Sequence, residues 1–171
     1  MKKFFTTLVI MMFALVANAQ FEQGNVMKFK QFTQGNNPLV FNCENCFMYI
    51  VDNKGKMVCD ESLRQFKDGT RFTTRLKTGS TTGRSSQIFL SIKAKGTLTI
   101  YASSSSSEED RQIVLLKGAK DIVTDVVEQT NKRPIKVEID KIGEYQISYP
   151  DGPINIYGIK FEAASATQEA E

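Results

Sequence analysis

Cysteines, carboxylates and aromatic rings are the side chains that could do chemistry, because the 171-residue chain contains no His and no Trp. Without His the sequence lacks the commonest general base and the commonest metal ligand. Serine triads, cysteine–histidine pairs and most zinc hydrolase sites are therefore excluded in their usual forms. We expect no catalytic residue, no metal and no cofactor, so the sequence predicts a protein that is not an enzyme.

The three cysteines are Cys43, Cys46 and Cys59. The Cys-Glu-Asn-Cys spacing is that of redox dithiols, which place the first cysteine at a helix N-terminus to lower its pKa. Here Asn53-Lys54-Gly55 follows between two apolar runs, which is the signature of a hairpin that would bring Cys59 back near Cys46. We expect a structural disulfide with all three pairings open and one thiol left over.

A serine run ends in three carboxylates, Glu108, Glu109 and Asp110. Carboxylate oxygens suit calcium, but consecutive residues rarely converge on one ion and no calcium-loop spacing is present. We expect a solvated hairpin loop in which Arg111 pairs with a nearby carboxylate. No other carboxylate pair stands in an apolar setting that would raise one pKa, as glycoside hydrolysis requires.

Short strands must position these groups, because most of the chain alternates apolar and polar residues between turn-forming residues. The segment 121–130 fits either a strand or a single turn, since its valines favour strands. The pattern predicts an all-β fold, an antiparallel two-sheet β-sandwich or jelly roll. The expected strands are 26–32, 47–52, 56–60, 71–77, 87–93, 97–102, 111–116, 135–140, 145–149 and 154–162.

The last of these strands changes phase at Gly158. Ile154 and Ile156 point to one face before it, and the inward positions shift by one residue after it. A glycine at a phase change predicts a β-bulge or a close backbone approach. The bulge could turn Asn155 and Tyr157 toward a ligand, or it could be an ordinary bulge with a solvated tyrosine.

The N-terminus has the features of a signal peptide over residues 1–19: two lysines, an apolar run and Ala17-Asn18-Ala19. Cleavage would remove Lys2 and Lys3 from the 22 basic residues and leave 20 against 19 acidic ones. This nearly neutral balance provides no excess of positive charge for binding nucleic acid. We expect an exported protein, periplasmic or secreted, with no membrane anchor after cleavage, one domain over residues 20–162, and a disordered polar tail over 163–171.

Four segments in order carry a family resemblance: FKDGTRFTTRLKTGST (66–81), GTLTIYASSSSSEEDRQIVLL (96–116), IGEYQISY (142–149) and GPINIYGIKFE (152–162). The chain resembles the non-catalytic β-sandwich domain appended to pectate lyases and other polysaccharide-degrading proteins of Bacteroidetes. This resemblance implies a secreted carbohydrate-binding-like module that acts beside such enzymes. An exported protein-interaction scaffold without a sugar ligand is the alternative.

The closing strand also looks like that of jelly-roll carbohydrate-binding modules, in which an Asn-Ile-Asp triplet helps to hold a structural calcium. Here Tyr157 replaces the Asp, so only Asn155 is carried over and the calcium is not expected. Tyrosines could stack on a sugar ring while arginines and an amide donate hydrogen bonds, which would suit an acidic sugar such as a uronate. The candidate ligand-binding residues are Tyr101, Arg111, Asn155, Tyr157 and Arg75, with Tyr149 as a further ring.

Overall fold

The computed structural model describes residues 20–21, 26–29, 39–83, 86–118, 120–128 and 132–165. The expected signal peptide and residues 166–171 of the expected tail lie outside these ranges. The last strand ends at Ala163, just past the expected domain boundary. No helix in the described part of the chain is long and apolar enough to cross a membrane.

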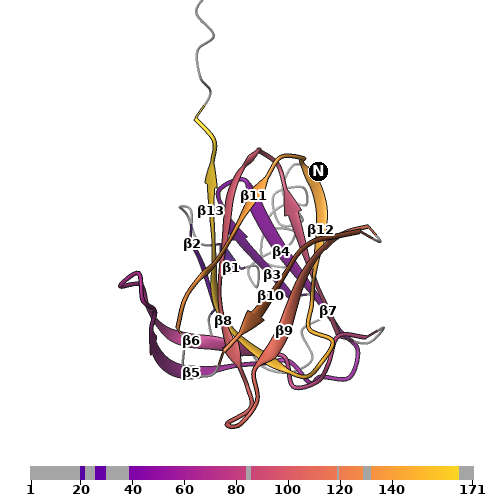
Figure 1. The fold of residues 1–171 in the computed structure, drawn as a ribbon. Helices are drawn as coiled ribbons and strands as arrows, with labels where there is room; N and C mark the ends of the chain where they lie inside the picture. The colour runs from indigo at the N-terminus through magenta and orange to yellow at the C-terminus, as the bar shows by residue number, and fades with distance from the viewer. Residues whose placement is uncertain are drawn as a thin grey trace, which may run out of the picture.

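The described strands form two sheets that pack against each other (Figure 1). The seven-stranded sheet has the order β1 (Gln20–Phe21), β3 (Leu39–Cys43), β4 (Cys46–Asp52), β7 (Ser86–Ile92), β12 (Gly143–Ser148), β9 (Arg111–Lys117) and β10 (Lys120–Val127). The six-stranded sheet has the order β11 (Ile135–Ile139), β8 (Gly96–Ser104), β13 (Ile154–Ala163), β6 (Arg71–Lys77) and β5 (Val58–Gln65), and β2 (Val26–Lys28) pairs with β13. Apart from the short parallel β1–β3 pairing, the described ladders are antiparallel. The prediction of an all-β antiparallel two-sheet sandwich is confirmed.

Residues that alternate along the strands fill the space between the sheets. Met48 and Leu90 from the seven-stranded sheet meet Leu98, Ile156 and Ile159 from the other, and each is fully buried. Burying one such side chain contributes about 1.5–3 kcal/mol, which makes this alternation the main source of stability. β10 belongs to the same pattern, so the ambiguous segment after residue 120 is a strand.

The chain crosses between the sheets repeatedly, and the predicted hairpin at Asn53–Gly55 is wrong for this reason. β4 and β5 lie in different sheets. The carboxylate of Asp52 accepts hydrogen bonds from the backbone N–H groups of Lys56, at 3.0 Å, and Met57, at 2.6 Å. These bonds redirect the chain and bury Met57 in the core, so Cys59 returns to the six-stranded sheet and not beside Cys46.

The serine-rich loop after β8 is likewise a crossing and not a hairpin, because β8 and β9 lie in different sheets. It projects from the lower end of the sandwich in Figure 1. Ser104 Oγ donates to the carbonyl of Glu109 at 2.5 Å, and Ser106 Oγ accepts from the N–H groups of Glu108 and Glu109 at 3.1 Å. The serines therefore shape the loop through local hydrogen bonds.

The predicted bulge in the last strand is confirmed. Ile156 pairs with Ala102 and Gly158 pairs with Tyr101, so Tyr157 is the extra residue. A Cβ atom on Gly158 would lie 2.3 Å from Cε1 of Phe72. Glycine is therefore required because an aromatic ring lies directly against the strand.

Candidate functional site

Three aromatic rings lie on the outer face of the seven-stranded sheet, and we call Phe47, Tyr49 and Phe89 the aromatic patch. Phe47 and Tyr49 alternate along β4 with buried residues, and Phe89 does the same along β7. β4 pairs with β7 so that Tyr49 stands directly opposite Phe89. The alternation therefore brings all three rings, each partly exposed, to one side of the sheet.

The rings of the aromatic patch contact one another. Tyr49 and Phe89 are stacked with centroids 4.9 Å apart and planes at 16°. Phe47 lies 6.2 Å from Tyr49, and Lys93 Nζ lies 5.8 Å from the Phe47 ring. Neighbouring rings hold each other in fixed orientations, which leaves a preformed apolar surface on a rigid sheet.

Hydrogen-bonding groups border the aromatic patch. Tyr49 Oη donates to Glu144 Oε1 of β12 at 3.3 Å. Burial acts to raise the pKa of Tyr49, and the Glu144 carboxylate acts in the same direction, so the hydroxyl keeps its proton. Further polar side chains at outward positions include Asn42 on β3, Gln87 and Ser91 on β7, and Gln146 on β12.

Sequence reasoning missed this arrangement entirely. The alternation of Phe47 and Tyr49 with Cys46, Met48 and Ile50 already indicated that both rings face away from the core. The pairing of β4 with β7, which are separated by two strands of the other sheet, carried no signal in the sequence.

The structure places two candidate tyrosines in a second buried cluster. Tyr101 is 3% exposed and Tyr157 is 2% exposed, and both pack against Phe66 of the β5–β6 hairpin. The Phe66 centroid lies 5.0 Å from Tyr101 and 5.6 Å from Tyr157, and Tyr101 Oη donates to Asp68 at 3.0 Å. The hairpin therefore covers the ring faces that a sugar would need, and the binding role of both residues stays a prediction. Tyr149 is fully buried in the main core.

Arg75 lies near this cluster and forms a two-point contact with Asp60, at 2.8 and 3.2 Å. Burial acts to raise the pKa of Asp60, but the hydrogen bond and charge of Arg75 outweigh it, and the pKa lies below its usual value. Lys77 Nζ lies 3.6 Å from the same carboxylate. The guanidinium is thus already engaged by an acid of the protein itself.

Arg111 and Asn155 lie at the serine-rich loop, and Asn155 is two residues before Tyr157 on β13. Arg111 pairs with Glu109 at 2.9 Å, as predicted, and also donates to the carbonyl of Asp151. Asn155 is 4% exposed, and its Nδ2 donates to the carbonyl of Ser104 at 3.2 Å. These contacts hold the loop ends together. Of the five candidate binding residues, four lie on the adjacent strands β6, β8 and β13 of the six-stranded sheet, whereas Arg111 lies on β9 of the other sheet.

The three cysteines are buried and carry free thiols in this structure. Cys43 and Cys46 face each other across the β3–β4 hairpin, and a hydrogen bond from Cys46 lowers the pKa of Cys43. Burial, with the charge of Asp60, raises the pKa of Cys59 to about 12. Cys59 thus has the low reactivity of a buried thiol, and the hairpin around Cys43 provides no helix N-terminus of the kind that active dithiols use.

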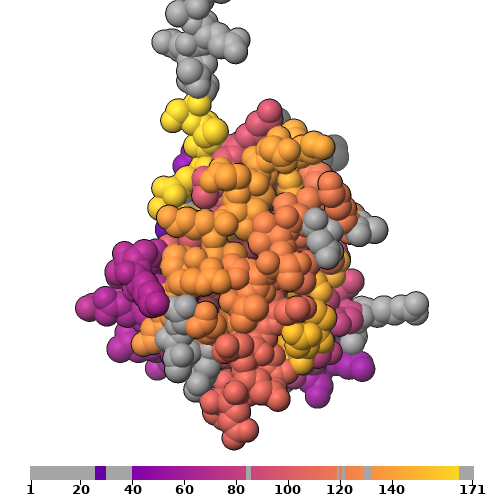
Figure 2. Space-filling model, in the orientation of Figure 1, coloured from indigo at the N-terminus to yellow at the C-terminus, as the bar shows by residue number. Residues whose placement is uncertain are grey.

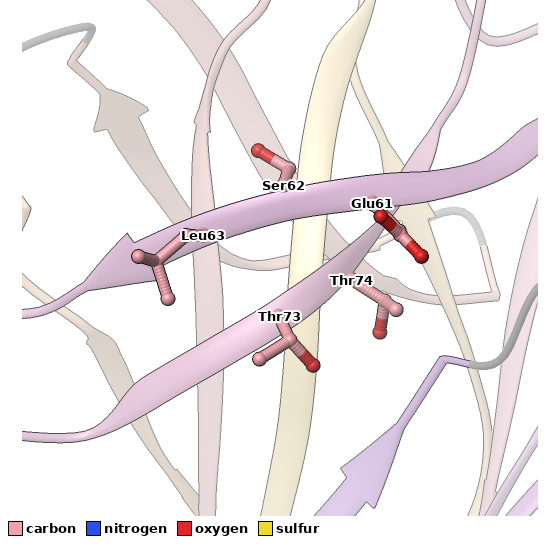
Figure 3. Close-up of a pocket in the computed structure, with 5 residues that line it drawn as sticks. All are labelled: Glu61, Ser62, Leu63, Thr73 and Thr74. Atoms are coloured by element: carbon pink, nitrogen blue, oxygen red, sulfur yellow. The ribbon is translucent and has the colours of Figure 1, made fainter.

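An open pocket of about 460 Å³ lies on the β5–β6 hairpin (Figure 3). Figure 2 shows this hairpin as a magenta lobe at the side of the molecule. The pocket is lined by Glu61, Ser62, Leu63, Thr73 and Thr74. Leu63 is 80% exposed. In Figure 3 the side chains of Ser62 and Leu63 point to opposite sides of β5. The pocket offers one carboxylate and hydroxyls around a single apolar side chain.

The described residues contain no group of three or more Cys, Asp or Glu side chains placed to hold a metal ion. Among the described residues, the carboxyl groups of Asp60, Asp68 and Asp125 have shifted pKa values, and each is shifted downward. A general acid requires the opposite shift.

Comparison with known proteins gives neither a matching family model nor a matching curated protein. Among solved structures, the chain is similar to one from work on glycan recognition by the Ruminococcus flavefaciens cellulosome, with 16% identity and a TM-score of 0.43 over 68% of this chain and 80% of that one. CsCBM6-3 from Clostridium stercorarium, in complex with cellobiose, gives 10% identity and a TM-score of 0.35 over 80% and 95%. CBM22-1–GH10 modules of Clostridium thermocellum xylanase 10B, complexed with xylohexaose, give 8% identity and 0.45 over 69% and 26%. At these values the likeness is one of general architecture, and a site must be assigned from the residues of this chain.

Proposed function

We propose that this protein is an exported, non-catalytic module that binds polysaccharide through the aromatic patch. The observation that carries the proposal is the stacked Tyr49–Phe89 pair, partly exposed on a sheet face and bordered by amides, a hydroxyl and a carboxylate. A sugar ring presents C–H groups on its faces and hydroxyls around its edge. Apolar rings with surrounding hydrogen-bonding groups match both parts of such a ligand.

The sequence supports the two further parts of this proposal, export and a role beside enzymes. The signal-peptide features support export, and the resemblance to domains appended to Bacteroidetes pectate lyases supports a role beside polysaccharide-degrading enzymes. We place the proposed binding surface at the aromatic patch because its rings are partly exposed, whereas those of Tyr101 and Tyr157 are buried.

Titration calorimetry of the chain without residues 1–19 against soluble xylan, β-glucan, mannan and pectin tests the proposal. We expect Phe89→Ala and Tyr49→Ala each to weaken binding about tenfold or more, equivalent to about 1.4 kcal/mol. Leu63→Ala is the matched control, because it removes an exposed apolar side chain from the pocket on the other sheet. Equal binding by Phe89→Ala and the wild type, or loss in Leu63→Ala alone, would contradict the assignment to the aromatic patch.

A second candidate function, binding of another exported protein, is favoured by the edge strand β10. Ile122 is 37% exposed and Val126 is 41% exposed on this strand, which ends the seven-stranded sheet. Unpaired edges with apolar side chains are sites of strand pairing between chains. If this function holds, the wild type captures an exported partner without binding any of these polysaccharides, and Ile122→Lys with Val126→Lys abolishes that capture.

A further inference from the structure

Within the residues that the structure describes, Glu144 is the single charged side chain at the outward positions of β4 and β7, which carry the aromatic patch, and of their neighbours β3 and β12. These positions face outward because they alternate with core residues such as Met48, Leu90 and Ile147. They hold Val40, Asn42, Phe47, Tyr49, Val51, Gln87, Phe89, Ser91, Glu144, Gln146 and Ser148.

The position of Glu144 is fixed by the aromatic patch itself. Tyr49 Oη donates to Oε1 at 3.3 Å, and Ser91 is the cross-strand partner of Glu144 on β7. One carboxylate oxygen is therefore held by the tyrosine, while Oε2 can accept hydrogen bonds from a ligand lying on the rings. Because a carboxylate is an acceptor without a donor, it bonds to hydroxyl groups and repels another carboxylate.

The cations that would suit an acidic sugar are engaged elsewhere. Arg75 is bound by Asp60 and Arg111 by Glu109, and neither lies on this face. Lys93, which follows β7, is the nearby positive group, with Nζ 5.8 Å from the Phe47 ring at one end of the patch.

We propose that Glu144 is a specificity-determining residue of the aromatic patch, which accepts hydrogen bonds from hydroxyl groups and makes the site select uncharged glycans over uronates. This inference rests on the proposed function. It differs from the expectation of an acidic sugar, which depended on the two arginines.

Calorimetry with two neutral hexasaccharides, cellohexaose and xylohexaose, and with hexagalacturonate, at low and high salt, tests this inference. We expect the wild type to bind one neutral ligand at least tenfold more tightly than the uronate. Glu144→Gln should reduce this ratio at least fivefold at low salt, and Glu144→Lys should bring the uronate to equal or tighter binding. Glu138→Gln is the matched control, because Glu138 is an exposed carboxylate that accepts a hydroxyl hydrogen bond from Thr97, at 2.9 Å, on the other sheet.

The outcomes separate the two proposals. Wild-type preference for the uronate, or a ratio that is the same in the wild type, Glu144→Gln and Glu144→Lys, overturns the role of Glu144 and leaves carbohydrate binding intact. An absence of binding to every glycan, including the polysaccharides tested above, overturns the proposed function and this inference together. If Glu138→Gln also loses selectivity, the effect comes from the overall charge of the protein, and this result would also overturn the role of Glu144.

Discussion

Gly158 sits where the ring of Phe72 crosses the last strand, beside the extra residue of the bulge. A Cβ atom there would lie 2.3 Å from Cε1 and 2.7 Å from Cζ of Phe72, and 3.0 Å from the carbonyl oxygen of Met27. We expect Gly158→Ala to lower the free energy of unfolding by about 1–3 kcal/mol, because the buried ring and the backbone must both move. Urea denaturation measures this change.

Gly83→Ala is the control for that substitution, because no atom lies within 4 Å of its added Cβ. Its stability should stay within about 0.5 kcal/mol of the wild type. Equal stability of Gly158→Ala and Gly83→Ala would show that Phe72 does not pack against β13 as described.

At the scale of one element, the β3–β4 hairpin suggests which cysteine pairing forms in an oxidising compartment. Cys43 and Cys46 are cross-strand partners with hydrogen-bonded thiols, whereas Cys59 lies in the other sheet. We expect a Cys43–Cys46 disulfide in exported protein, formed when both thiols pass their hydrogens and two electrons to a cellular disulfide donor. Closure of so short a loop stabilises the fold by about 2 kcal/mol.

Mass spectrometry after alkylation in denaturant measures this pairing. One alkylated thiol, Cys59, and a mass lower by two hydrogens are expected, with no alkylation in Cys59→Ser. Three alkylated cysteines in protein collected from the exported fraction, or a link that includes Cys59, would show that another arrangement forms.

The sequence predicted features that neighbouring residues determine, and it did not predict contacts between residues far apart in the chain. The bulge at Gly158 follows from the phase of neighbouring residues, and the strand at residues 71–77 from its own alternation. The burial of Tyr101 was not predictable in this way, because Phe66 and Asp68 cover it from a hairpin more than 30 residues earlier. The turn at Asn53–Gly55 has hairpin residues, yet Asp52 and the buried Met57 send the chain to the other sheet.

The same limit applies to the candidate site. Phe47 and Tyr49 could be assigned to an outward face from alternation alone, but Phe89 and Glu144 join them only through the strand order β4–β7–β12. That order depends on the crossings between the sheets, which long-range packing determines. Tyr101, Tyr157 and Arg75, which were named from motifs in the sequence, lie in contacts with Phe66, Asp68 and Asp60 that only the folded chain brings together.

For the whole molecule, acid pH should weaken the fold through its ion pairs. Burial acts to raise the pKa of Asp60, but the hydrogen bond and charge of Arg75 outweigh it and lower this pKa. The hydrogen bond and charge of Arg133, whose Nη2 lies 2.5 Å from Asp125 Oδ1, lower the pKa of Asp125. As pH falls, carboxylates of the unfolded chain bind protons first, near their usual pKa of about 4. The stabilisation is thus fully present above that value and is lost as pH falls through the lower pKa values of the folded state.

Thermal melts from pH 7 to pH 2.5 should show a constant Tm above about pH 5 and a fall that begins below about pH 4. Asp60→Asn should lower the Tm at pH 7 and make the fall shallower, because the depressed pKa is removed. The fall should be modest overall, since both side chains are partly exposed and water screens their pairs. The double variant Asp60→Asn/Arg75→Gln should follow the pH profile of Asp60→Asn, because both variants lack the Asp60–Arg75 ion pair. A profile for Asp60→Asn as steep as that of the wild type would mean that the Asp60–Arg75 pair contributes nothing to the acid sensitivity of the fold.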